Sequence, residues 1–394
     1  MRDSFTARSD RVFRRELQIS RLVESHIREE NITGAVALIA RRGDVIYHDA
    51  CGVSGEGQTT SLLRRDSIVW IASLTKPVVA CAVLMALDDG KLKLDDPVSR
   101  FIPELGGTRR VRIFDPAVFK AGRYAVFTDV PKHVTGSSKS EVTIRDLLAH
   151  TSGLQSIGIP NPAVPRVTRV DTVAKWTKRL ASVPLDFEPG TSWAYSNEVA
   201  FDVLVRVVEV IYAEPFQRLM KRRLLDPLGM TDTGFGTQIG DCERKVRLSP
   251  ALEANPRVRG TRFFSGSAGL WSTALDYWRF AQMLLNRGSF AGQQILRAET
   301  VDMFVSDQAR GLFTGWAGID GQGAAMGLGV LVVKDPVKAG ISLSAGSFGW
   351  DGMRTSRFWV VPENDLVIIA LTFGPNPNPV HRSIEDAVME AFGT

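Results

Sequence analysis

Ser73 and Lys76 are the first residues whose types and spacing could perform chemistry. They stand three positions apart, so on a helix they share one face and the lysine amine can reach the serine hydroxyl. The segment that follows, residues 74–88, is almost wholly apolar, which predicts a buried helix. A lysine in such a helix is desolvated, so its pKa falls and the amine can activate a hydroxyl that is inert alone. The pair is also compatible with a capping serine and a lysine whose stem packs on apolar surface.

Two later segments carry polar groups that could complete such a site. Tyr195 and Asn197 stand between a predicted turn at 187–191 and a helix, where a phenol can point into a cleft and act as a general base beside a lysine ammonium. Residues 346–353 are glycine-rich and precede a strong strand. A glycine in an edge strand lets a ligand or another backbone approach closely, and two N–H groups aimed at one point would form an oxyanion hole. A buried tyrosine with a satisfied hydroxyl and a plain glycine-rich turn are the structural alternatives.

The elements that must position these groups change character along the chain. Hydrophobic spacing predicts helices through the middle and strands near both ends. A weakly patterned stretch at 105–140 is expected to be a loop that contributes to a cleft rim. The economical architecture is an α+β fold: one antiparallel sheet built from both termini and flanked by helices, with a mostly helical lobe inserted. The expected helices are 11–30, 74–88, 142–149, 170–183, 197–213, 215–226, 272–286, 297–305 and 381–391, and the expected strands are 34–40, 45–47, 327–333, 357–361 and 366–371.

The combination of these motifs resembles the serine β-lactamase and penicillin-binding-protein superfamily. Within it, the chain is most similar to class C β-lactamases, DD-peptidases and family VIII carboxylesterases. The resemblance extends from about residue 30 to about residue 390 and includes several connecting segments in the family's order. They are Ile71-Ala72-Ser73-Leu74-Thr75-Lys76-Pro77, Leu147-Leu148-Ala149-His150-Thr151-Ser152-Gly153-Leu154, Pro189-Gly190, Pro227-Leu228-Gly229-Met230 and Ser267-Ala268-Gly269-Leu270-Trp271-Ser272-Thr273.

This resemblance implies a role for each matching residue. Ser73 matches the acylated nucleophile and Lys76 its partner. Tyr195 matches the tyrosine that acts as base and then as acid, and Asn197 matches a residue that contacts substrate or the lysine. The backbone N–H groups of Ser73 and Met353 would hold the oxyanion. The implied fold is a single two-lobed domain over 1–394, with an α/β lobe at about 1–95 and 270–394 and a helical lobe at about 96–269; no cofactor is implied.

The sequence departs from the family pattern at Trp350-Asp351-Gly352, where peptidases and lactamases carry Lys-Thr-Gly or a histidine variant. The family's cation there helps to recognise a substrate carboxylate. Trp350 cannot replace it, and Asp351 would repel an anion unless its side chain turns away. We therefore expect a carboxylesterase or acyltransferase for neutral or apolar small-molecule esters, with Trp350 and the 105–140 loop lining an apolar pocket beside Asp351 and Gly352. The alternatives are a β-lactamase, DD-peptidase or small-amide hydrolase, suggested by Asn197, and a catalytically inactive binding homologue.

The composition of the chain argues against several other classes of protein. The chain has 394 residues and a formal net charge of +5, with basic and acidic residues interspersed, which argues against nucleic-acid binding. The three cysteines show no metal-ligand spacing and predict no disulfide framework, and no metal is expected. The polar N-terminus lacks a signal-peptide core and no stretch is apolar enough to span a bilayer, so we expect a cytoplasmic protein. No Gly-x-Ser-x-Gly motif occurs, and His150 is expected to be structural; the oligomeric state is left open.

Overall fold

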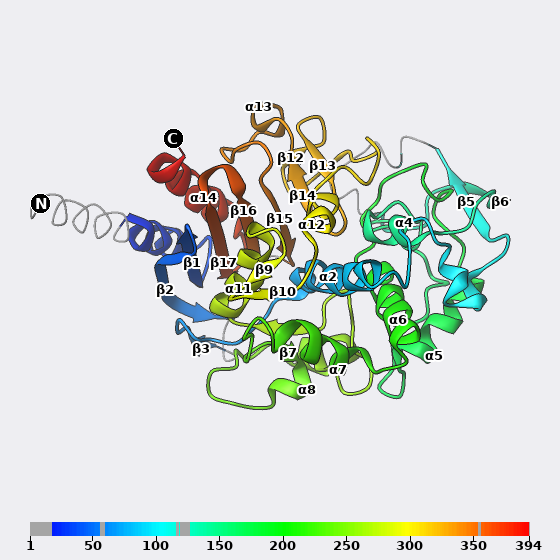
Figure 1. The fold of residues 1–394 in the computed structure, drawn as a ribbon, viewed down its shortest axis with the longest axis horizontal. Coiled ribbons are helices and arrows are strands. Elements are labelled where there is room, and N and C mark those ends of the chain that lie inside the picture. The colour runs from blue at the N-terminus through cyan, green and yellow to red at the C-terminus, as the bar shows by residue number, and fades with distance from the viewer. Residues whose placement is uncertain (1–17, 56–59, 116–117, 119–126, 354–355, 394) are drawn as a thin grey trace, which may run out of the picture.

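An eight-stranded antiparallel sheet forms one side of the molecule (Figure 1). The computed structural model describes residues 18–55, 60–115, 118, 127–353 and 356–393. The strand order is β13-β14-β15-β16-β17-β1-β2-β3, so strands from the two ends of the chain meet inside one sheet, as the sequence predicts. The strands are β1 (Gly34–Arg41), β2 (Asp44–Ser54), β3 (Ser61–Leu62), β13 (Ala324–Met326), β14 (Leu331–Val333), β15 (Phe348–Gly352), β16 (Ser356–Val361) and β17 (Leu366–Phe373).

The two strands predicted at 34–40 and 45–47 are present and form a hairpin. Strands β1 and β2 are joined at Arg42 and Gly43, which both have positive φ, at 54° and 83°. Two such residues match the right-handed twist of the flanking strands, as in a type I′ turn. The other edge of β1 pairs with β17 in continuous register from Gly34↔Phe373 to Arg41↔Leu366.

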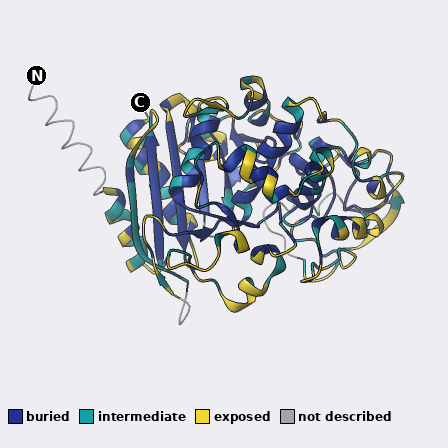
Figure 2. Cartoon of the chain, turned by 60° about the horizontal axis from the view of Figure 1, so that its bottom comes forward, coloured by how far each residue is buried: buried dark blue, intermediate teal, exposed yellow. Residues whose placement is uncertain are grey.

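Helices cover both faces of this sheet, which explains why its central strands are apolar throughout (Figure 2). On one face, Tyr277 of α11 (Ala274–Leu285) packs its ring 5.1 Å from Phe358 of β16. On the other, Arg357 of β16 pairs with Glu385 of α14 (Asn378–Phe392). The N-terminal helix, described over 18–28, adjoins α14 through a 3.1 Å hydrogen bond between His26 and Ser383. Of the predicted 11–30 helix, residues 11–17 lie outside the described part, and Glu29 and Glu30 form a turn after it.

The middle of the chain folds mostly as helices and loops to one side of the sheet (Figure 1). It also contains short strands, of which β4 (Val69–Trp70), β8 (Leu270–Ser272) and β7 (Gly234–Phe235) form a three-stranded sheet. Helix α2 (Thr75–Asp88) runs between the two parts and packs against α6 (Ala200–Tyr212). The remaining helices are α4 (Ile144–Leu148), α5 (Val173–Arg179), α7 (Phe216–Met220), α8 (Gly236–Ile239), α9 (Pro250–Ala254), α10 (Pro256–Arg259), α12 (Ala298–Phe304) and α13 (Pro336–Ala339).

The loop prediction for 105–140 is wrong in part. This stretch contains a hairpin of β5 (Arg110–Phe114) and β6 (His133–Ser137). Strand β6 is largely exposed and contains glycine and serine, so its pattern carries no hydrophobic signal. Residues 116–117 and 119–126 lie outside the described part. The strand predicted at 327–333 is also shorter, because β14 begins at Leu331 and the residues before it form a turn after β13.

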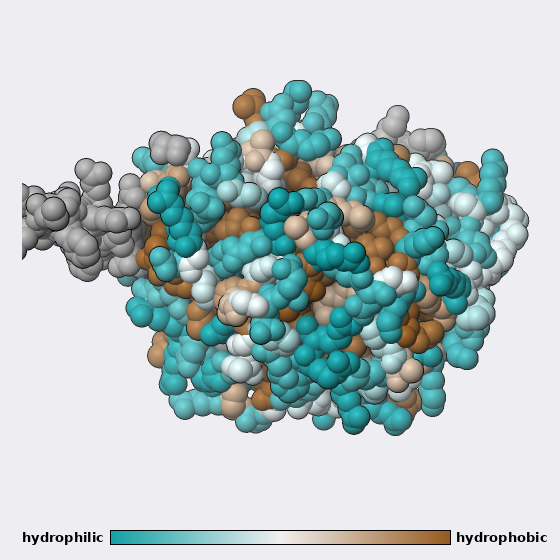
Figure 3. All heavy atoms as spheres, viewed as in Figure 1, coloured by the Kyte–Doolittle hydropathy of each residue, from teal (hydrophilic) through white to brown (hydrophobic). Residues whose placement is uncertain are grey.

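The surface shown in Figure 3 is mostly hydrophilic, with apolar patches separated by polar side chains. This agrees with the interspersed charges of the sequence. Within the described residues, no helix combines the length and the apolar character needed to cross a membrane. Cys51, Cys81 and Cys242 are all free, and Cys81 is buried in α2 as predicted.

Candidate active site

Ser73 lies in a 3-10 turn, Ala72–Leu74, directly before the first residue of α2. Ala72 has a φ of 46°, which is a left-handed backbone conformation. This conformation is unfavourable in free energy for residues other than glycine, so it persists only where the surrounding structure holds it in place. Two hydrogen bonds to the neighbouring residues Leu74 and Thr75 hold this turn in place. The Tyr277 hydroxyl donates to the Leu74 carbonyl at 3.0 Å, and Thr75 Oγ1 accepts a hydrogen bond from the Leu270 N–H at 3.1 Å. Ser73 is therefore held at a helix N-terminus, where developing negative charge is favoured.

Lys76 is fully buried, and its amine makes three hydrogen bonds. Lys76 Nζ donates to Ser73 Oγ at 3.2 Å, to the Asn197 carbonyl at 3.0 Å and to the Ser267 carbonyl at 2.8 Å. Burial lowers the pKa of Lys76 from 10.5 to about 7, and the carboxylates of Asp202 and Glu198 oppose that shift. With a pKa of about 7, roughly half of the amine is neutral at pH 7. Its predicted contact with Ser73 is present, and its contact with Asn197 is through the main chain.

Asp202 fixes one of the carbonyls that hold Lys76, and the sequence reasoning missed it. It is fully buried in α6, where it accepts hydrogen bonds from the Ser267 N–H at 3.0 Å and Ser265 Oγ at 2.7 Å. Arg257 Nε lies 3.2 Å from its other oxygen. Burial raises the pKa of Asp202, whereas Arg257 and the hydrogen bonds lower it. A single acid within the apolar run 200–205 was the available signal, because such an acid needs buried partners.

Tyr195 is the second residue, after Lys76, that hydrogen-bonds to Ser73 Oγ. Its hydroxyl donates to Ser73 Oγ at 2.8 Å, and Lys76 Nζ lies 4.9 Å from the centre of its ring. The loop that carries Tyr195 is held by His150, whose Nδ1 accepts the Ser196 N–H at 3.2 Å and whose carbonyl accepts the Ala194 N–H at 3.1 Å. Burial, with a smaller effect of Lys76, lowers the pKa of His150 well below 6.5, so it is a neutral positioning group.

The glycine-rich strand lies against the turn that carries Ser73. A Cβ at Gly352 would be 2.7 Å from the Ile71 carbonyl oxygen, so only glycine permits this approach. Ser356 Oγ, opposite Gly352 on β16, donates to the same carbonyl at 3.2 Å. Pairing between β14 and β15 stops at Gly349, so the segment from Trp350 to Gly352 is paired only with β16. Met353 follows at its exposed end.

Trp350 and Asp351 point to opposite faces of β15, as successive residues of a strand do. Trp350 is 2% exposed, and its ring centre lies 5.4 Å from that of Tyr195. Asp351 instead pairs with Arg357 at 2.6 Å, and Arg357 also contacts Glu385 at 3.1 Å. The carboxylate of Asp351 is therefore turned away from Ser73 and neutralised. The structure does not bring its carboxylate together with Ser73, Lys76 and Tyr195.

Trp316 is an aromatic residue beside Tyr195 that the sequence did not predict as part of the site. Trp316 comes from a short hairpin of β11 (Gly315–Trp316) and β12 (Ile319–Asp320). Its ring is 4.5 Å from that of Tyr195 and 5.7 Å from that of Trp350, nearly parallel to the latter. The Ala317–Gly318 pair between the strands was a turn signal in the sequence, but nothing local related it to Tyr195.

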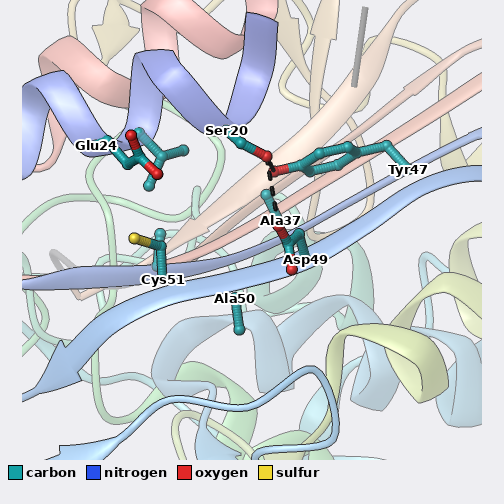
Figure 4. Close-up of a pocket in the computed structure, with 9 residues that line it drawn as sticks. Ser20, Glu24, Ala37, Tyr47, Asp49, Ala50 and Cys51 are labelled. Carbon is teal, nitrogen blue, oxygen red and sulfur yellow. Dashed lines mark hydrogen bonds between the residues drawn. The ribbon is translucent and has the colours of Figure 1, made fainter. Parts of the chain in front are cut away.

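A separate small cavity lies beneath the N-terminal helix (Figure 4). It has a volume of about 80 Å³ and is lined in part by Ser20, Glu24, Tyr47 and Asp49. The Ser20 hydroxyl lies 3.1 Å from that of Tyr47 and donates to Asp49 at 3.3 Å. This volume is well below the roughly 300–1,000 Å³ of small-molecule sites. Among the described residues, no group of three or more His, Cys, Asp or Glu side chains could hold a metal ion.

Comparison with known proteins decides the family. The Beta-lactamase family model matches residues 19–392. The chain belongs to the beta-lactamase family. It is 33% identical over 365 residues to protein Rv1367c of Mycobacterium tuberculosis, an alignment that covers 86% of this chain and 85% of that protein. It is 30% identical over 427 residues to Esterase EstB of Burkholderia gladioli, covering 98% of this chain and 95% of the esterase.

A solved structure supports the same fold. EstCE1, described as a hydrolase with promiscuous acyltransferase activity, superimposes with a TM-score of 0.72 at 24% identity, covering 96% of this chain and 98% of EstCE1. The chain is thus a serine hydrolase of the beta-lactamase family, with the β-lactamase/transpeptidase-like fold that the sequence motifs predict.

Proposed function

We propose that this member of the beta-lactamase family is a carboxylesterase that acts on neutral or apolar esters through a Ser73 acyl-enzyme. The observation that carries the proposal is the hydroxyl of Ser73, within hydrogen-bonding distance of Lys76 and Tyr195 and beside the Trp350 ring instead of a cation. The esterase named among its relatives supports the same activity. Transfer of the acyl group to an alcohol is the variant in which an alcohol replaces water.

In the proposed first step, Ser73 Oγ attacks the ester carbonyl carbon and its proton passes to the neutral Lys76 amine. We favour Lys76 over Tyr195 for this proton because burial lowers the pKa of its amine to about 7, and in the neutral amine the 3.2 Å contact can have the Ser73 hydroxyl as donor. A neutral lysine uses two N–H groups on the Asn197 and Ser267 carbonyls, which leaves its lone pair for Ser73.

The later steps use the remaining groups. The N–H groups of Ser73 and Met353 would hold the oxyanion, and collapse of the tetrahedral intermediate breaks the bond to the alcohol. The departing alkoxide takes the Tyr195 proton, and the Lys76 ammonium restores it. Water then attacks the acyl-enzyme by the reverse sequence of proton transfers.

A pair of esters of similar shape tests the substrate class. We would compare the kcat/KM of p-nitrophenyl 4-methylpentanoate with that of mono-p-nitrophenyl succinate, which carries a carboxylate in place of the terminal branched methyl groups. Among the described residues, Trp350 occupies the position of the family's cation and cannot offset the desolvation of a carboxylate, so the neutral ester should be favoured by about tenfold or more. Equal rates, or preference for the anion, would contradict the assignment of neutral substrates.

Two controls test the rest of the proposal. Ser73→Ala should remove turnover of both esters, and activity that survives this change would refute Ser73 as the nucleophile. Nitrocefin turnover as fast as ester turnover would instead favour β-lactam hydrolysis.

A further inference from the structure

Trp350 itself offers almost no surface to a substrate. It is 2% exposed, and its ring is nearly parallel to two others, with interplanar angles of 17° to His150 and 8° to Trp316. Their ring centres lie 6.1 Å and 5.7 Å from that of Trp350. Trp316 is only half-buried. Of the three described rings in this stack, that of Trp316 therefore has the most surface left for a ligand, and Trp350 packs against its inner side.

The hairpin that carries Trp316 is a tightly constrained element. Ala317 and Gly318 form a two-residue connection with φ values of 51° and 82°, as in a type I′ turn. Arg382 of α14 donates to the Gly318 carbonyl at 3.2 Å, which ties the turn to the covering helix. Such preorganisation lowers the entropy cost of using Trp316 as a contact surface.

Trp316 also lies next to the group that handles the leaving alcohol. Its ring centre is 4.5 Å from that of Tyr195, and the Tyr195 hydroxyl is 2.8 Å from Ser73 Oγ. In the mechanism proposed above, the alcohol takes its proton from Tyr195 as it departs. A substituent on that alcohol would therefore leave next to the Tyr195 ring, on which Trp316 packs.

We propose that Trp316 determines specificity on the alcohol side of the ester and selects aromatic alcohols, of the benzyl or phenyl class. This inference rests on the proposed esterase function. Indole and phenyl rings attract each other in offset or edge-to-face geometry beyond the effect of buried area, with ring centres about 4.5–7 Å apart, as the rings around Tyr195 already do. An aliphatic ring of equal size lacks this attraction between aromatic rings.

Substrates matched for size and leaving-group acidity test the proposal on the unmodified protein. Benzyl butyrate and cyclohexylmethyl butyrate share an acyl group and a primary alcohol, and differ in the aromatic ring. The expected kcat/KM is about threefold to tenfold higher for the benzyl ester. An equal or lower value for the benzyl ester would overturn the proposal.

Variants assign the effect to Trp316. Trp316→Leu should abolish the benzyl preference, measured as the ratio of kcat/KM for benzyl butyrate to kcat/KM for cyclohexylmethyl butyrate, and Trp316→Phe should restore part of it. The matched control is Trp278→Leu, a half-buried tryptophan of α11 that packs on Phe290 and should leave the preference unchanged. A benzyl preference that persists in Trp316→Leu, or an equal loss on ethyl and benzyl esters, would overturn the role of Trp316.

The Ser73→Ala variant distinguishes failure of the proposed esterase function from failure of the proposed specificity of Trp316. If Ser73→Ala keeps hydrolysing ethyl butyrate, the proposed esterase function fails whatever Trp316 does. If Ser73→Ala is inactive and the benzyl preference does not depend on Trp316, only the specificity inference fails.

Discussion

Burial of Lys76 should make the stability of the fold depend on pH, and this dependence tests whether the amine is neutral. The pKa of Lys76 is about 7 in the folded chain and ordinarily 10.5. Between these values the unfolded chain binds one more proton than the folded chain, so the free energy of unfolding rises with pH. The cost of burying the amine is fully present below about pH 7 and is lost above about pH 10.5.

The size of the effect follows from the two pKa values. The protonation cost is about 4 kcal/mol at pH 7 and falls to about 2 kcal/mol at pH 9. Lys76→Met removes this titration and keeps a side chain of similar length. The variant also loses the three hydrogen bonds of the amine, but that loss does not vary with pH.

The assay is denaturant unfolding of the wild type and Lys76→Met at pH 7, 8 and 9. All other titrating groups are shared, so the difference between the two proteins isolates Lys76. We expect the wild type to gain about 2 kcal/mol relative to the variant from pH 7 to pH 9. A difference that stays constant would show that Lys76 keeps its charge, and would refute its proposed role as the base. In parallel, kcat/KM for a neutral ester should rise with pH and level off above about pH 7.

Three other substitutions have defined outcomes. Tyr195→Phe should lower kcat by about 10²–10⁴-fold with an unchanged circular dichroism spectrum, and a near-normal rate would place the proton donor elsewhere. Gly352→Ala should reduce both activity and melting temperature, because its Cβ has no room beside the Ile71 carbonyl; an active, equally stable variant would contradict that packing. Arg357→Met should cost about 3–5 kcal/mol in denaturant unfolding because it leaves Asp351 in an unpaired, partly buried state, and a change below about 1 kcal/mol would show that the ion pair is dispensable.

Most of the fold was predictable because its signals are local. The apolar run at 74–88 became α2, and the apolar strands at 366–371 and 34–40 became the paired centre of the sheet. The hairpin at 110–137 was not predictable, because β6 is exposed on its surface and has no apolar face. Helix 170–183 was predicted too long, because α5 ends at Arg179 and a 3-10 turn follows.

The sequence by itself determined the candidate nucleophile and its lysine, since a spacing of three residues across the 3-10 turn that leads into a buried helix brings Ser73 and Lys76 together whatever surrounds them. The tertiary structure decided what else meets them. Trp316 stands 121 positions after Tyr195 in the sequence, yet their rings are in contact, and Asp351 turns away because Arg357 lies opposite it on β16. Such contacts depend on how distant segments pack, and packing across a folded core leaves no periodic signal in the chain.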